Sequence, residues 1–200
     1  MKKISFLTII FLLLMSISSH GLFIFNETES AFDEPDNIKA LIIQGAGQFL
    51  STYNNFISLL HALELSSNDV NELNSLLINV TVNMEKAKSS YKQLSITAYN
   101  TPYKQVVIDN IIGFDYTGFQ EENQPIPLIF KKVITRLSTG NISGVYSDVY
   151  DLTSEILALL QEVDFQTNVK SNIFLLYKIN QKFIEAFLIG QYVANIFNFI

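Results

Sequence analysis

The sequence contains no cysteine and no tryptophan, and Arg136 is its single arginine. The absence of cysteine excludes disulfide bonds, thiolate catalysis and cysteine-ligated metal ions. His61 is the one histidine that remains once the expected leader is removed. Structural zinc needs four nitrogen or sulfur ligands, and metal sites in helix bundles take histidines from two helices. We therefore predict no metal ion and no cofactor, and a surface or helix-capping role for His61.

Charged residues are scarce, at 16% of the chain, whereas hydrophobic residues make up 48%. The net charge is −6, and it becomes −8 without Lys2 and Lys3, since 11 basic side chains then stand against 19 acidic ones. Nucleic acids and anionic bilayers are bound through clusters of lysine and arginine. This charge balance predicts no nucleic-acid partner, and no membrane contact once the leader is cleaved.

The first 21 residues have the three parts of a secretory signal peptide. Lys2 and Lys3 precede an apolar run, Ile4 to Met15, which is too short to span a bilayer alone. Small and polar residues follow, and cleavage is expected between residues 18 and 21. We expect a secreted or periplasmic protein. The alternative is a membrane-tethered one with an uncleaved anchor, because Leu22 to Phe25 prolongs the apolar character.

Beyond the leader, apolar residues recur at alternating steps of three and four, which is the spacing of helices packed along their length. This spacing predicts long helices over 38–63, 70–99, 143–163 and 168–200, and short ones over 102–113 and 128–137. Segment 22–36 is acidic and is expected to be a flexible arm, which leaves residues 37–200 as a single domain. The predicted fold is all-α. It is a bundle of four long heptad-spaced helices, with two short helices and an aromatic loop between the second and third. An irregular all-α globule is the alternative, because ordinary amphipathic helices give similar steps.

The final stretch, Asn168 to Ile200, contains no proline and one glycine, and we expect it to be the central helix that the others surround. One apolar seam passes through Ile173, Asn180 and Phe187, and the last third is apolar on all sides. Such a segment is buried in a core, an interface or a membrane, and fifteen residues from Ala186 are too few to span a bilayer. We predict that this segment packs against the bundle on one side. On its other side it meets either the inserted short helices or another chain, which is a protein partner or a second copy. The candidate interface residues are Leu188, Ile189, Tyr192, Val193, Ile196 and Phe199.

The predicted loop 114–127 combines aromatic, acidic and glycine residues, as recognition loops do. The same rings would also serve as a local plug at the end of the bundle, and both interpretations stay open. The candidate recognition residues are Phe114, Asp115, Tyr116 and Phe119.

No arrangement of polar residues indicates catalysis. Ser58 lies one turn from His61, which is a common spacing in any helix, and acid–base work needs a carboxyl group in an apolar setting. We expect Asp148 and Glu155 on the solvent side of the helix over 143–163. The sequence therefore predicts no catalytic residues and no enzyme.

The favoured function is an exported, non-enzymatic interaction or structural protein, a component of a bacterial envelope or secretion assembly. The runner-up is a carrier of an apolar ligand or lipid, because 16 phenylalanines and the small residues Gly45, Ala46, Gly47 and Gly190 would leave a cavity between helices. A membrane-active helical protein that releases its C-terminal segment comes third. An enzyme comes last.

Overall fold

The computed structural model describes residues 36–64, 69–101, 105–113, 128–166 and 169–199. For residues 191–199, and for some others within the helices, only the backbone is described. The described helices all fall within residues 31–200, which group as one unit. The predicted signal peptide, the acidic arm up to residue 35 and the loop 114–127 lie outside the described residues.

The described residues are almost all helical and include no strand, which confirms the predicted all-α class. In chain order the helices are α2 (Asp36–Glu64), α3 (Val70–Asn100), α4 (Gln105–Ile112), α5 (Leu128–Ser138), α6 (Ile142–Gln161) and α7 (Val169–Phe199). The bounds of the long helices lie within two residues of the predicted ones. Within the described part of the chain, no helix combines the length and apolar character that crossing a membrane requires.

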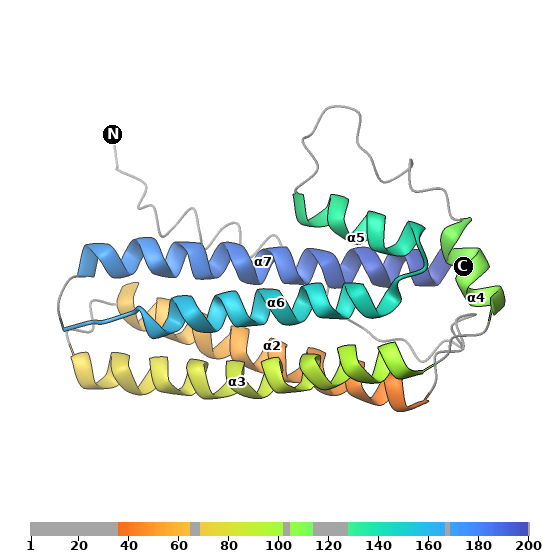
Figure 1. Cartoon of the computed structure of the whole chain (residues 1–200). Helices are drawn as coiled ribbons and strands as arrows, with labels where there is room; N and C mark the ends of the chain where they lie inside the picture. The colour runs from red at the N-terminus through yellow and green to blue at the C-terminus, as the bar shows by residue number, and fades with distance from the viewer. Residues whose placement is uncertain (1–35, 65–68, 102–104, 114–127, 167–168, 200) are drawn as a thin grey trace. The chain divides into compact units, whose positions relative to one another are not determined.

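The long helices lie alongside one another and alternate in direction along the chain (Figure 1). α2 packs against α3, α3 against α6, and α6 against α7. Aromatic rings join α2 to α7: those of Phe49 and Tyr53 contact those of Phe183 and Phe187, with centroids 4.9 to 5.3 Å apart. The short helix α5 contacts α4, α6 and α7.

Two helices begin at side-chain caps. Asp69 Oδ1 accepts hydrogen bonds from the backbone N–H groups of Asn71 and Glu72, at 2.9 and 3.3 Å. Asn141 Oδ1 accepts one from Gly144 N–H, at 2.9 Å. These oxygens satisfy N–H groups that the first turn of a helix leaves without a partner. The local sequence therefore determines where α3 and α6 begin.

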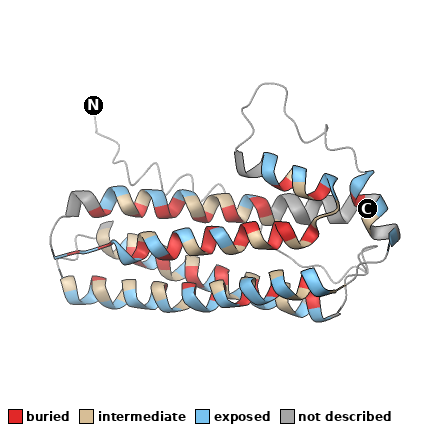
Figure 2. Cartoon of the chain, in the orientation of Figure 1, coloured by how far each residue is buried: buried red, intermediate tan, exposed pale blue. Residues whose placement is uncertain are grey.

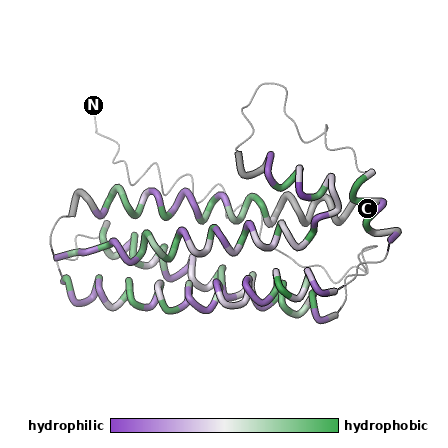
Figure 3. The backbone as a smooth tube through the Cα atoms, in the orientation of Figure 1, coloured by the Kyte–Doolittle hydropathy of each residue, from purple (hydrophilic) through white to green (hydrophobic). Residues whose placement is uncertain are grey.

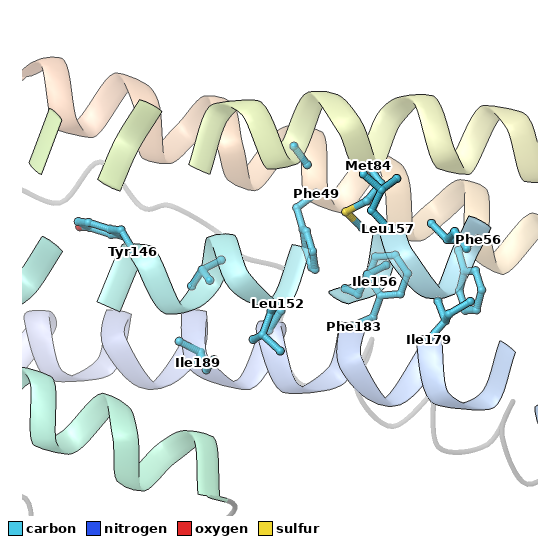
Figure 4. Packing of buried hydrophobic residues seen from close by; sticks show 14 of the residues in the cluster. Phe49, Phe56, Met84, Tyr146, Leu152, Ile156, Leu157, Ile179, Phe183 and Ile189 are labelled. Atoms are coloured by element: carbon cyan, nitrogen blue, oxygen red, sulfur yellow. The ribbon is translucent and has the colours of Figure 1, made fainter. Parts of the chain in front are cut away.

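Phenylalanine rings meet in the middle of the core. Phe183 of α7 is fully buried, and its ring centroid lies 5.2 Å from those of both Phe49 and Phe56 of α2. Ile156 of α6 and Met84 of α3 lie close to these rings (Figure 4). Burying each such side chain stabilises the fold by roughly 1.5–3 kcal/mol, so these contacts set how the long helices pack.

Among the side chains that the structure describes, buried residues make up a larger share of α6 than of α7, the helix that the sequence led us to expect at the centre. α6 contacts α3, α5 and α7, and buried residues cover most of its length (Figure 2). Its buried residues include Asp148 and Thr153, and such polar residues made α6 look half-solvated in the sequence. The prediction that Asp148 faces solvent is wrong, because a neighbouring helix covers it with compensating charges.

α7 is exposed where its predicted seam begins. Ile173 lies on that seam but is 42% exposed, whereas Asn172 beside it is buried. A seven-residue repeat drifts slowly around a straight helix of 3.6 residues per turn, so one seam does not stay buried over 31 residues. The buried stripe has moved back onto the predicted seam by Asn180 and Phe183.

Candidate functional site

A buried charge cluster occupies the corner between α5 and α6. The side chain of Asp148, on α6, is 1% exposed. Lys132 Nζ lies 2.6 Å from Asp148 Oδ1, and Arg136 Nε lies 3.4 Å from Asp148 Oδ2. The two cations are four residues apart and therefore project from the same side of α5.

The charges of this cluster differ in their access to water. The side chains of Lys132 and Arg136 are 46% and 37% exposed, so water hydrates both cations in part. Asp148 has no such access, and Lys132 Nζ approaches Oδ1 outside hydrogen-bonding geometry, so this contact is purely ionic. A desolvated carboxylate is costly unless it is paired. Asp148 therefore depends on α5 for its charge compensation and holds α5 against α6.

A tight, hydrogen-bonded turn between α5 and α6 brings these residues together. α5 ends in a Schellman motif, in which Gly140 N–H donates to Leu137 O and Asn141 N–H donates to Arg136 O, both at 2.8 Å. Gly140 has a φ of 69°, in the left-handed region that favours glycine. Asn141 is also the N-cap of α6, so α5 and α6 are joined with almost no intervening loop.

Gly144 makes room for the only arginine of the chain. A Cβ atom at position 144 would lie 2.8 Å from Arg136 Cδ and 2.7 Å from Asn141 Nδ2. Both distances are shorter than a van der Waals contact. A glycine in the first turn of α6 therefore allows Arg136 to cross that turn and reach Asp148.

The chemistry of this cluster is that of a structural ion pair. Acid–base catalysis needs a titrating group within reach of a substrate, and Asp148 is enclosed by α5 and α6. Across the described residues, no three side chains of histidine, cysteine, aspartate or glutamate are grouped in a way that would hold a metal ion. What the arrangement does is position α5.

The spacing of apolar residues did not predict this cluster, although the charged residues of the sequence indicate it. α5 carries Lys131, Lys132 and Arg136 and no acidic residue, so its charge is not balanced within the helix. Asp148 follows soon after it, between the apolar residues Val145 and Val149. An acid set among apolar residues next to an unbalanced basic helix indicates a buried ion pair.

Hydrogen bonds between polar side chains and neighbouring elements occur elsewhere in the core. Ser90 Oγ, on α3, donates to Gln48 Oε1, on α2, at 2.6 Å. Asn172, on α7, accepts from Asp164 N–H at 3.0 Å and donates from Nδ2 to Asp164 O. The first pair fixes α2 against α3, and the second fixes the link before α7 to that helix.

Lys182 joins α7 to α6 at the surface. Its Nζ lies 2.9 Å from Glu155 Oε2 on α6 and 3.1 Å from Glu185 Oε2 on its own helix. Burial alone would lower the pKa of Lys182, but hydrogen bonds and charges from Glu155 and Glu185 outweigh this effect and raise that pKa. The side chains are partly exposed, so this bridge is a weak restraint.

An aromatic ring closes the small-residue patch of α2. Ring carbons of Tyr91, on α3, lie 3.4 Å from the place that a Cβ atom of residue 45 would take. Desolvation by burial raises the pKa of Tyr91 to about 12. Gly47 faces outward, with nothing within 4 Å of a Cβ atom there, and His61 is exposed in the last turn of α2. Protein therefore fills the space beside Gly45 that a carrier would leave for its ligand.

The predicted interface on the last helix is described only in part. Ile189 is 1% exposed and belongs to the core, whereas Leu188 is 39% exposed. Burial makes Ile189 a packing residue of this chain, and Leu188 remains accessible. The candidate residues outside the described side chains are Tyr192, Val193, Ile196 and Phe199 on the last helix, and Phe114, Asp115, Tyr116 and Phe119 in the loop.

Comparison with known proteins gives no assignment for this arrangement. No protein-family model matches the chain, and no curated protein and no solved structure matches it either.

Proposed function

We propose that this chain is an exported, non-enzymatic helical protein that binds other protein chains within a bacterial envelope or secretion assembly. In this proposal α2, α3, α6 and α7 form one four-helix bundle, and this rigid bundle presents the binding surfaces. The signal-peptide pattern at the N-terminus supports export.

One observation carries the proposal: large apolar side chains stand exposed on helices whose other sides are already packed. On α2 these are Ile43 and Leu50, seven residues apart, and on α3 Ile78 and Val82, one turn apart. Single exposed apolar residues are normal on a protein surface, but groups of them mark places where another chain binds. Helix faces of this kind fit a role in assembly.

The buried polar groups also favour binding over catalysis. Asp148, Ser90 and Asn172 are all buried, and each contacts a neighbouring segment of the chain. Their roles are accounted for by packing, with no group left over in an accessible cleft that would act on a substrate. This holds for the residues whose side chains the structure describes.

The proposal is tested by photo-cross-linking in the native cells. A photoreactive phenylalanine is placed at Leu50 or at Leu188, and a matched control carries it at the exposed polar residue Gln93 of α3. The expected result is a discrete protein adduct from the first two positions and none from the third. N-terminal sequencing of the same material should begin near residues 19–22. Equal labelling at all three positions, or an N-terminus at Met1, would contradict the proposal.

A further inference from the structure

The outer sides of α2 and α7 carry an apolar face beside the seam where the two helices meet. We call this the α2–α7 face; it consists of Ile43, Gly47, Leu50, Ile173, Phe174 and Leu188. Its five large side chains are between 39% and 60% exposed. Leu50 follows Phe49 and Leu188 follows Phe187, and the rings of Phe49 and Phe187 touch across the seam. Side chains next to these rings therefore flank the seam on both helices.

Residue spacing makes this face suitable for a further helix. Ile43, Gly47 and Leu50 follow one another at steps of four and three, and Phe174 and Leu188 are fourteen residues, or two heptads, apart. Side chains at such steps pack into holes between the side chains of a facing helix. Gly47 supplies such a hole, because the space around it is open.

The distribution of charge points to a second copy as the occupant. No aspartate, glutamate, lysine or arginine occurs from Ala40 to Leu63, and the one acid of α7, Glu185, is paired with Lys182. The chain as a whole carries a net charge of −6, so two copies repel one another elsewhere. Figure 3 shows how frequent hydrophilic residues are along α3, which is therefore the less suitable side.

Two-fold symmetry makes this charge argument stronger. In a two-fold dimer the same patch meets itself, so a charge near the axis lies close to its own copy. A face with few charges avoids most of that cost. Lys178, whose Nζ lies 4.5 Å from the Phe174 ring centroid, covers one edge of the face and would remain at the rim of the interface.

The size of the face fits a dimer of moderate strength. Taking about 200 Å² for a fully exposed large side chain, the five apolar residues expose roughly 500 Å². This apolar area is distributed along the helix pair, from Ile43 near the start of α2 to Ile173 near the start of the antiparallel α7. With the polar residues between them, such a face approaches the ~800 Å² that each partner buries in a standard interface.

We infer that the α2–α7 face binds a second copy of this chain to form a two-fold dimer. This inference rests on the proposed function and names the partner for one of its surfaces. α2 and α7 run in opposite directions. A two-fold axis through the seam therefore places the α2–α7 pair of one copy against the α2–α7 pair of the other.

Light scattering on the purified full chain tests this inference. The expected mass is twice that of the chain at the upper end of the micromolar range, with dissociation into single chains only on further dilution. Leu50→Lys and Leu188→Lys should each weaken the dimer by about 10- to 100-fold, because each variant buries two new charges, one from each copy, in an apolar interface. Added sodium chloride should strengthen the wild-type dimer, since it screens the repulsion between two acidic chains.

Ile78→Lys is the matched control, because Ile78 is 61% exposed on α3 and lies outside the face. This variant should dimerise like the wild type, and thermal unfolding followed by circular dichroism should show all variants folded. A wild-type monomer throughout the micromolar range, or a Leu50→Lys variant that dimerises unchanged, would overturn the inference. A monomer that still gives adducts of other masses in the cellular cross-linking would leave the proposed function standing and assign the face to a different chain.

Discussion

Arg136 of α5 reaches across the first turn of α6 and places its Nε 3.4 Å from Oδ2 of Asp148. The two partners of this ion pair are unequal, because the arginine side chain is 37% exposed and the aspartate side chain is 1% exposed. If the ion pair is broken, water can therefore hydrate Arg136 but cannot reach Asp148. This asymmetry predicts which substitutions at the corner are costly.

Removing the cations should destabilise the protein more than removing the anion. With Lys132→Met and Arg136→Met together, Asp148 is left buried without compensation, and the free energy of unfolding should fall by about 3–5 kcal/mol. Asp148→Asn leaves two cations that hydrate, and its loss should be about 1–2 kcal/mol. Urea unfolding followed by circular dichroism measures both values.

Lys131→Met provides the control, because Lys131 is exposed on the same helix and should change stability by no more than about 0.5 kcal/mol. The triple variant with Asn at 148 and Met at 132 and 136 should recover part of the loss of the double variant. A larger loss for Asp148→Asn than for the double variant would contradict the asymmetry.

The turn after α5 predicts a specific effect at Gly140. With a φ of 69°, an alanine there should lower the free energy of unfolding by about 1–2 kcal/mol, whereas asparagine tolerates this region better. Both substitutions add a Cβ atom 3.0 Å from Ile108 Cγ2, so this crowding is common to both. Thermal unfolding of Gly140→Ala and Gly140→Asn compares them. Equal losses would mean that crowding against Ile108, not backbone strain, sets the cost.

Burial of Tyr91 predicts a loss of stability at high pH. Its pKa is raised from 10.0 to about 12, so the folded state keeps its proton where the unfolded state loses it. The resulting stability is complete below pH 10 and falls by up to ~1.4 kcal/mol per pH unit between about pH 10 and 12. Tyr53 is half-buried like Tyr91 and shares this shift, to about 12, so both tyrosines contribute to the decline.

Urea unfolding at several pH values, on the wild type and Tyr91→Phe, measures this effect. The decline above pH 10 should be shallower in Tyr91→Phe. Loss of the Lys182 bridge at high pH occurs in both proteins and cancels in the comparison. Tyr99→Phe is the matched control for removal of a tyrosine hydroxyl, since Tyr99 is exposed. Parallel profiles for Tyr91→Phe and the wild type would contradict the role of burial.

The parts of the fold that the sequence predicts are those with local causes. Phe49 and Phe56 lie on one face of α2, so periodicity alone places them in the core. The cap at Asp69 follows from its own side chain. The burial of Asp148 has a distant cause, because it depends on cations from another helix. Periodicity within one helix cannot report a contact of that kind.

In the candidate interface on α7, too, the sequence predicts only what has a local cause. Leu188 and Ile189 are neighbours and equally apolar, and the sequence offered both as interface residues. Only their angular position relative to α6 separates them: Ile189 is buried in the core and Leu188 is partly exposed. The sequence did not single out Ile43 and Leu50, because their exposure depends on which side of α2 the other helices cover.

Two buried asparagines of α7 differ in how their hydrogen-bonding groups are satisfied. Asn172 bonds to both backbone groups of Asp164, through Oδ1 and Nδ2. Asn180 is buried to a similar degree, but its Oδ1 accepts no hydrogen bond from the described residues. A buried acceptor without a donor costs roughly 1–3 kcal/mol of desolvation.

Leucine at these two positions should therefore have opposite effects. Asn180→Leu removes the desolvated oxygen, keeps the number and branching of the side-chain heavy atoms, and should raise the free energy of unfolding by about 1–2 kcal/mol. Asn172→Leu leaves the N–H and C=O of Asp164 without these partners and should lower it by about 1–3 kcal/mol. Urea unfolding measures both, and an unchanged m-value would show that the unfolded state is not altered. If Asn180→Leu instead lowers the free energy of unfolding, the amide of Asn180 is satisfied by water or by a bound chain. A loss of stability that appears only at concentrations where the chain self-associates would point to the bound chain.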